Sequence, residues 1–307
     1  MSLRQIVATL GGELYQNGLR ANVPAPGHGK GDRSVSLLLT AGRVVIHTFG
    51  AADWREVRDD LRRRGLVDHS GRFLGGVTSP DAPVIDHPRR RAVAGALWQA
   101  GLRPAPNGVV ARHLTGRGVT WRADLDDLLE HPSAPLSVYR QGRRTGRAMM
   151  AGIRAPSGDL TAVELTYLSP NGLVATGLRV PRKTVGQVPP GSAVRLCAPA
   201  ARMLVGEGVV TTLSAMMRFD LPGWALLSAG NLSRWRAPEN VAAVVIAGDR
   251  GAAGERAAMR LARRLEDDGV KASLAFPPAP WGDWNEALQA DQTEGKEGDG
   301  GAPEGRG

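Results

Sequence analysis

The feature that most constrains this chain is the alternation of short apolar runs with helical segments between residues 200 and 288. The apolar runs lie at residues 203–205, 225–227, 241–247 and 272–276. Residues 209–217 and 254–267 repeat their apolar side chains with helical spacing. Strands that alternate with helices in this way predict a mostly parallel sheet with helices packed on it.

An acidic residue stands at or just beyond the end of three of these predicted strands. These residues are Glu207, Asp249 and Asp283, and glycines flank the first two. Ligands of open α/β sheets bind beyond the carboxyl ends of the strands, and missing side chains let a phosphate or a metal approach the backbone. The alternative is that these acids only cap the helices that follow them.

The chemistry available to residues 200–288 is narrow. All six histidines lie in the first 131 residues, and the single cysteine, Cys197, precedes this segment. Any catalysis there must use carboxylates, hydroxyl groups or a metal held by oxygen atoms. One cysteine also excludes an internal disulfide framework and a cysteine-rich zinc site.

Residues 1–75 predict a small α+β unit. We expect a helix from the start to about Asn17-Gly18, a Pro/Gly-rich loop at 23–32, and strands at 34–39 and 43–48. Asp53 should cap a helix at 54–64. Residues 76–87 resemble a linker.

The middle of the chain predicts a change from helices to strands. Pro88 begins a helix, 111–118 follows a Pro/Gly break, and 123–130 has the composition of an acidic helix. Strands at 148–154, 160–168 and 173–180 are separated by turn sequences and predict an antiparallel meander.

The expected fold class is therefore α/β plus α+β: a mostly parallel sheet flanked by helices, preceded by an antiparallel meander and a small N-terminal α+β module. The expected division is 1–75, a linker and helix at 76–110, a basic region with the meander at 111–199, the parallel α/β domain at 200–288, and a disordered acidic tail at 289–307.

The chain is strongly basic, with a net charge of +9 at pH 7. All but four of its 39 basic residues are arginine, and the tail from Gln289 onward is acidic, so the excess of positive charge lies in the body. A basic body suits a phosphate polymer, because releasing counterions drives binding. An arginine-, alanine- and glycine-rich composition can also reflect coding bias alone. No run of 18 apolar residues exists to span a bilayer, and we expect a cytoplasmic protein without a membrane partner.

Three segments, in order, resemble the motifs of a Toprim domain. Residues 204–214 (LVGEGVVTTLS) resemble its first motif, a strand ending in Glu-Gly before a helix. Residues 244–254 (VVIAGDRGAAG) resemble its Asp-x-Asp motif, and 277–288 (PPAPWGDWNEAL) is similar to the closing Gly-Lys-Asp-Trp/Phe-Asn segment of plasmid and phage primases. The resemblance extends upstream to 111–118 and 166–172, and to an N-terminal zinc-binding module at 22–61.

The zinc module departs from the family pattern. Val23, Thr48 and Ala52 stand where the family has cysteines, and His28 with His47 supplies at most two of the four ligands that zinc needs. We therefore expect no zinc.

The resemblance implies a primase-like enzyme from a mobile element or a bacterial chromosome. Glu207 would act as acid/base or metal contact, Asp249 would bind Mg²⁺ or Mn²⁺, and Asp283 would support them. The phosphates of template or nucleotide would be bound by Arg179, Arg182, Lys183 and Arg250. The implied partners are single-stranded DNA, nucleoside triphosphates and a replicative helicase supplied in trans, because no Gly-x-x-x-x-Gly-Lys-Ser/Thr loop is present.

Gly251 occupies the position of the second aspartate in Asp-x-Asp, which leaves the site one carboxylate short. Two alternatives therefore stay open: a catalytically weakened DNA-binding accessory protein of replication, and a Toprim nuclease that uses the same acids for strand cleavage.

Overall fold

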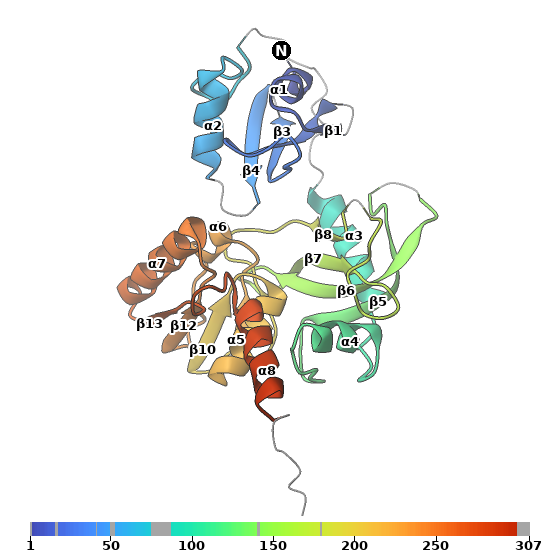
Figure 1. Ribbon diagram of the computed structural model, residues 1–307, viewed down its shortest axis with the longest axis vertical. Coiled ribbons are helices and arrows are strands. Elements are labelled where there is room, and N and C mark those ends of the chain that lie inside the picture. Colours follow the sequence, from blue (N-terminus) through green and yellow to red (C-terminus); the bar gives the residue numbers. More distant parts are fainter. Residues whose placement is uncertain are drawn as a thin grey trace, which may run out of the picture. The chain divides into compact units, whose positions relative to one another are not determined.

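The computed structural model describes residues 2–15, 18–40, 42–49, 53–74, 87–139, 142–178 and 180–299. The chain divides into two compact units, Met1–Ile85 and Asp86–Gly307, which are described separately (Figure 1). The predicted linker at 76–87 lies outside the described residues except for its last position.

The first unit is an antiparallel sheet with two helices (Figure 1). Its strands pair in sequence order, and the helices bury one apolar stripe each against them. The elements are α1 (Leu3–Leu10), β1 (Glu13–Tyr15), β2 (Arg20–Val23), β3 (Val35–Thr40), β4 (Arg43–Thr48) and α2 (Trp54–Arg63). The two predicted strands and the Asp53 cap are confirmed, since Asp53 Oδ1 accepts from the Arg55 amide at 2.9 Å. The opening helix is shorter than predicted: Gly11 and Gly12 have φ of +82° and +118°, which ends it.

A carboxylate organises the loop that the resemblance assigns to zinc. Asp32 accepts hydrogen bonds from the amides of Ala25 and Ser34, at 3.0 Å each, and from the Ser34 hydroxyl at 2.6 Å. The Ser34 hydroxyl and these amides lower the pKa of Asp32 to about 2. His28 Nδ1 lies 3.0 Å from the same carboxylate, so this loop is held by Asp32.

The second unit begins with α3 (His87–Gln99) and α4 (Val109–Gly116), followed by an antiparallel sheet in the order β5-β6-β7-β8. Its strands are β5 (Leu128–Pro135), β6 (Thr145–Arg154), β7 (Leu160–Tyr167) and β8 (Arg182–Gly186). Helix α3 packs on one face of this sheet, against Val163, Leu165 and Tyr167.

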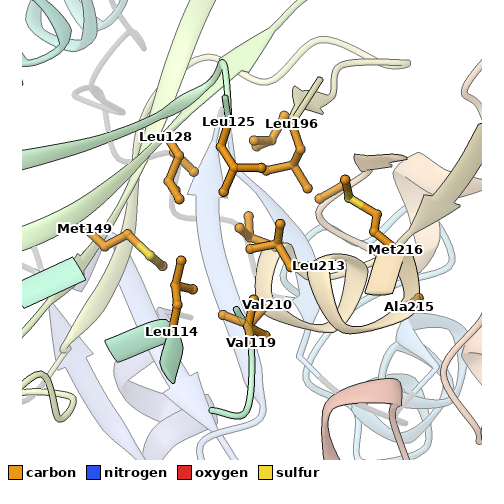
Figure 2. Packing of buried hydrophobic residues seen from close by; sticks show 14 of the residues in the cluster. Leu114, Val119, Leu125, Leu128, Met149, Leu196, Val210, Leu213, Ala215 and Met216 are labelled. Carbon is orange, nitrogen blue, oxygen red and sulfur yellow. The ribbon is translucent and has the colours of Figure 1, made fainter. Parts of the chain in front are cut away.

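The other face of the antiparallel sheet joins the parallel domain in one hydrophobic core (Figure 2). Leu114 of α4, Leu128 of β5 and Met149 of β6 belong to the same buried cluster as Val210 and Leu213. Because these side chains are buried together, the antiparallel sheet and the parallel domain are joined by a shared core, while each also has a further buried cluster of its own.

The other sheet of the second unit has the order β13-β12-β10-β11-β9, with only β9 antiparallel to its neighbour. Its elements are β9 (Val194–Arg195), β10 (Arg202–Gly206), α5 (Val209–Phe219), β11 (Gly223–Ala225), α6 (Ala229–Leu232), β12 (Ala243–Ala247), α7 (Ala252–Asp267), β13 (Lys271–Ala275) and α8 (Trp284–Asp299). Alternate residues of each strand face opposite cores. Leu204 packs toward α5, whereas Met203 and Val205 pack toward α7. The predicted parallel α/β architecture is confirmed.

Two predicted elements of the middle region are wrong. The acidic helix at 123–130 is instead a series of turns leading into β5, because Leu128–His131 pair with β6 and the Asp127 carboxylate is bonded to Arg154. The strand at 173–180 is also absent from the described part of that range. Strand β7 pairs instead with β8, and the side chain of Leu173 is 63% exposed.

The expected tail also differs from the structure. Helix α8 continues to Asp299, past the boundary at 288, and it is fastened to the preceding structure by its polar side chains. Gln292 Nε2 donates to the Gly118 carbonyl at 2.8 Å, and Asp291 lies 3.5 Å from Arg218. Residues 300–307 lie outside the described part of the chain. Within the described residues, no helix is both long and apolar enough to cross a membrane.

Candidate functional site

Parallel strand register brings two predicted acids to one edge of the sheet. Gly206, the last residue of β10, pairs with Ala247, the last residue of β12. Glu207 follows the first strand directly and Asp249 follows the second after one glycine. We call Glu207, Asp249, Asp283 and Glu286 the acid edge, because the charges of the other three all act on Asp249.

Asp249 is the most perturbed carboxyl group of the acid edge. Burial, and after it the charges of Glu207, Asp283 and Glu286, raise the pKa of Asp249 to about 7. Its Oδ1 atom is buried and has no hydrogen-bond partner among the described residues. A buried carboxylate oxygen without a donor is costly unless a proton or a cation neutralises it.

Glu207 is half-buried, and burial raises its pKa, while a hydrogen bond from the Ala229 backbone amide opposes that rise. The Glu207 carbonyl accepts from the Leu227 amide at 2.7 Å, which fixes the loop after β10 against the loop after β11. Helices α5 and α7 have Gly208 and Gly251 as their N-caps, without a side-chain cap. Neither Glu207 nor Asp249 is therefore the cap of the helix that follows it.

Asp283, by contrast, is a helix cap. Its Oδ1 atom accepts from the amides of Asn285 and Glu286 at 2.8 and 2.9 Å, at the start of α8. Glu286 Oε2 reaches back to the Gly282 amide at 2.8 Å. This arrangement is similar to a capping box, except that Glu286 bonds to the amide one residue before the cap. The alternative raised from the sequence therefore holds for Asp283. Asp283 still contributes negative charge to Asp249.

Arg250 connects the two halves of the acid edge. Its Nε donates to the Pro277 carbonyl at 2.6 Å, and its backbone amide donates to the Gly282 carbonyl at 2.8 Å. These bonds hold the segment after β13 against the loop that carries Asp249. Arg250 was predicted to bind phosphate; in the structure its Nε is used to position this loop.

The other predicted phosphate-binding residues lie on the antiparallel sheet. Arg182 starts β8 and is exposed, with its Nε 4.0 Å from Glu164. Lys183 Nζ donates to the Leu136 carbonyl at 2.9 Å and lies 4.9 Å from the Tyr167 ring, and burial lowers its pKa. Arg179 lies outside the described residues. Arg182 is therefore the more available of the two described cations.

Sequence reasoning missed two residues of this region, Glu286 and Asn285. Asn285 is fully buried, and its Nδ2 donates to the Arg117 carbonyl at 2.6 Å and to the Ser214 hydroxyl at 3.0 Å. It therefore ties α8 to α5 and to the end of α4. The Trp-Asn-Glu sequence was the signal that could have pointed to both residues. Their roles could not be predicted from it, because the partners of Asn285 are more than 60 residues away and Glu286 bonds to the loop before its own helix.

Gly251 has φ of +115° and ψ of 148°, a conformation that strongly favours glycine. A Cβ atom there would meet no heavy atom within 4 Å, and the Gly251 amide donates to Glu255 Oε1 at 3.2 Å. Backbone conformation, rather than space, therefore opposes a side chain at this position.

These residues fit a hard divalent cation bound through few protein ligands. In the described part of the chain, no three His, Cys, Asp or Glu side chains are grouped closely enough to enclose a metal. Mg²⁺ needs only one or two carboxylates when substrate phosphates and water complete its shell. The unpartnered oxygen of Asp249, with Glu207 beside it, is the donor set that suits such a cation.

Comparison with known protein families identifies the domain that carries the acid edge. Residues 202–294 match the family described as "Toprim domain", and residues 88–196 match a "Domain of unknown function (DUF7146)". Residues 202–294 are therefore a Toprim domain, and the resemblance of the three motifs to that domain is confirmed. No curated protein sequence matches it.

Solved structures of primases resemble the chain distantly. The primase fragment of the bacteriophage T7 primase-helicase protein is 15% identical, with 86% of this chain and 93% of that chain covered and a TM-score of 0.42. The Aquifex aeolicus primase (zinc binding and RNA polymerase domains) is 13% identical, with 97% and 82% covered and a TM-score of 0.42. A DNA primase domain from Pseudomonas aeruginosa is 17% identical, with 68% and 77% covered and a TM-score of 0.39.

Proposed function

We propose that the protein is a Toprim primase that transfers nucleotides onto a primer along a single-stranded DNA template, with Mg²⁺ or Mn²⁺ as its cation. The observation that carries this proposal is Asp249: its buried Oδ1 has no hydrogen-bond partner in the described part of the chain, and it lies at the carboxyl edge of a Toprim sheet, next to Glu207. Both carboxyl groups have raised pKa values, so each exchanges protons nearer neutral pH than an ordinary carboxylate.

The residues of the chain would divide the work as follows. Asp249 and Glu207 would hold the cation, which supplies charge neutralisation for the reacting phosphates when it is bound. Glu207 would also accept the proton of the attacking hydroxyl group. Asp283 would strengthen the negative field while it caps α8. Arg250 would keep the two acidic loops together through its bonds to Pro277 and Gly282.

Binding of the polymer would depend on the basic surface. The net charge of +9 favours phosphate contacts, and Arg182, Lys183 and Arg179 would contact template or triphosphate. A helicase would act in trans in a cytoplasmic replication complex of a bacterial chromosome or a mobile element.

The test is primer synthesis by the full chain on single-stranded templates, with ribo- and deoxyribonucleotides and with Mg²⁺ or Mn²⁺. A primase yields short products that need both template and cation. Single-stranded DNA should also bind with a steep dependence on salt, and Arg182→Ala should lower the slope by about one. Loss of template nucleotides with no primer formed would instead identify a Toprim nuclease.

One observation favours a second function, that of a DNA-binding accessory protein. Gly251 removes the second acid of Asp-x-Asp, and its conformation favours glycine, so the loop is adapted to the missing carboxylate. An accessory protein would bind single-stranded DNA with the same salt dependence and would form no primers with any nucleotide or cation. Variants of Glu207 and Asp249 would then leave every measurable activity unchanged.

A further inference from the structure

A groove of about 1040 Å³ lies beside β9, at the far side of the parallel sheet from β12 and β13. Segments 197–199 and 236–238 line it and lead toward the amino ends of β10 and β12. The acid edge lies at the carboxyl ends of the same strands. The groove is therefore separate from the proposed catalytic site, and its volume is at the upper end of ordinary ligand pockets, about 300–1,000 Å³.

The lining of the groove is basic. It includes five arginines and two aspartates: Arg103, Arg154, Arg195, Arg234, Arg236, Asp126 and Asp127. Arg236 has a further acidic partner outside the lining, because its Nη1 lies 2.9 Å from Asp268 Oδ2. Positive charge remains in excess even when that partner is included.

The excess charge is concentrated where two arginines, Arg154 and Arg195, lie near a single carboxylate, Asp127. Asp127 is 1% exposed, and both of its oxygens accept from Arg154 Nε, at 2.8 and 2.9 Å. Arg195 contributes its backbone amide to the same carboxylate at 3.1 Å. Asp127 therefore neutralises Arg154, and among the described residues no other carboxylate pairs with the Arg195 guanidinium.

Arg195 is held in place although its charge is unpaired. Its Nη2 donates to the carbonyls of Ala155 and Pro156 at 3.1 and 3.2 Å, and its guanidinium lies 4.7 Å from the Trp224 ring. Burial, together with the charge of Arg154, lowers the pKa of Arg195, while Asp127 opposes that shift. An anion that binds next to this fixed, partly desolvated guanidinium would supply the counterion that it lacks among the described residues.

Arg234 extends this positive surface. Its side chain is exposed, and within the described residues it has no hydrogen-bond or ion-pair partner. Trp98, half-buried, also lines the groove and offers an aromatic surface near the arginines. Arginines next to an aromatic ring are a combination that suits nucleotides.

We propose that this groove, centred on Arg195 and Arg234, is a second anion site that binds the phosphate groups of a nucleotide. The phosphates would belong either to a free nucleoside triphosphate or to the backbone of single-stranded DNA. Arg195 is the fixed contact, and Arg234 is the mobile one that adapts to the ligand.

Binding is measured on the full chain in the presence of EDTA, so that the acid edge has no cation to recruit phosphate. The probes are ATP and a short oligothymidylate. Their dissociation constants are measured by calorimetry and by tryptophan fluorescence. Arg234→Glu should weaken binding by roughly tenfold or more, because it reverses a charge beside the phosphate. Arg195→Gln should have a similar effect, and its melting temperature reports any loss of the bonds to Ala155 and Pro156.

The matched control is Arg263→Glu, the same charge change at an exposed position of α7. It should weaken binding less than twofold. Weakening of both probes by Arg234→Glu assigns the groove to free nucleotides as well as DNA, and weakening of the oligonucleotide alone assigns it to the DNA backbone. The proposal is overturned if neither probe binds, or if Arg234→Glu behaves like Arg263→Glu.

Failure here is distinguishable from failure of the proposed primase activity. Glu207→Ala should leave ATP and oligothymidylate binding in EDTA unchanged, because it lies at the opposite ends of the strands. A chain that makes no primers can therefore still bind phosphate in this groove.

Discussion

Glu207 and Asp249 follow neighbouring parallel strands whose last residues, Gly206 and Ala247, are in register. After burial itself, the Glu207 carboxylate is the largest cause of the raised pKa of Asp249, about 7. Two carboxyl groups held this way at one sheet edge disfavour full ionisation of both. This relationship sets the pH and metal behaviour expected of the protein.

The first prediction concerns pH. The pKa of Asp249 is 3.8 in an ordinary environment and about 7 in the fold, so between these values the folded chain holds a proton that the unfolded chain has lost. Stability should therefore fall as pH rises from about 4 to about 7. Asp249→Asn should flatten this fall. It should also raise the melting temperature at pH 8, by about 2–4 °C for each kcal/mol gained in the free energy of unfolding.

The control for that measurement is Asp267→Asn, an exposed aspartate on α7. It should leave the pH profile as it is. Mg²⁺ should raise the melting temperature of the wild type at pH 8 and should not raise that of Asp249→Asn. An unchanged pH profile in Asp249→Asn would contradict the assignment of this carboxyl group.

The second prediction concerns catalysis. Glu207→Ala and Asp249→Ala should each lower primer synthesis by about 100-fold or more, since each removes a cation ligand or proton acceptor. Both variants should bind single-stranded DNA like the wild type, because neither changes an arginine. Glu239→Ala, an exposed glutamate, is the control and should keep full activity. Equal activity of all three variants would remove the acid edge from the mechanism.

The third prediction concerns zinc. Val23 is fully buried in the core of the first unit, and Asp32 holds the loop where the resemblance places ligands. His47 lies against Phe49, with ring centroids 4.7 Å apart. Purified protein should therefore contain no stoichiometric zinc, and a chelator should leave its melting temperature unchanged. Elemental analysis that finds about one zinc per chain would contradict this.

Much of the parallel domain could be predicted because its evidence is local. A buried strand followed by a glycine and an acid is visible in five or six residues, and parallel register then brings Glu207 and Asp249 together. The sequence shows that Gly251 replaces a carboxylate, whereas its φ of +115° is visible only in the structure. The cap at Asp283 was an open alternative that only its hydrogen bonds decide.

The parts that could not be predicted depend on distant partners. Residues 123–130 have the composition of a helix, but pairing with β6 and the bond between Asp127 and Arg154 override that preference. The exposed Leu173 fits an alternating pattern without being part of a strand. The role of Asn285 depends on Arg117, 168 residues away in the chain.

The fourth prediction concerns Asn285. Asn285→Ala would remove the donor shared by the carbonyl of Arg117, an exposed residue, and the buried Ser214 hydroxyl. Each buried polar group left unsatisfied costs about 1–3 kcal/mol, so chemical denaturation should show a clear loss of stability. Gln292→Ala removes a comparable bond to Gly118 at an exposed site and should change stability by less than about 0.5 kcal/mol. Equal effects of the two variants would show that Asn285 is not a tie between α8 and the rest of the unit.

The last prediction concerns Gly251, where the sequence lacks a carboxylate. Gly251→Asp places an acid two residues after Asp249, and no atom within 4 Å blocks its Cβ. The φ of +115° makes any side chain there costly, by about 1 kcal/mol or more. Gly251→Asn carries the same strain without the charge, so it is the matched control.

We expect both variants to lower the melting temperature by similar amounts without metal. Only Gly251→Asp should then gain stability from Mg²⁺ beyond the wild type, because a third carboxylate strengthens the field around the cation. If the protein is a primase weakened by the missing acid, the same variant should also raise the rate of primer synthesis at low Mg²⁺. Identical Mg²⁺ responses of the two variants would mean that the side chain at 251 does not reach the cation, and the absence of the second acid would then not explain low activity.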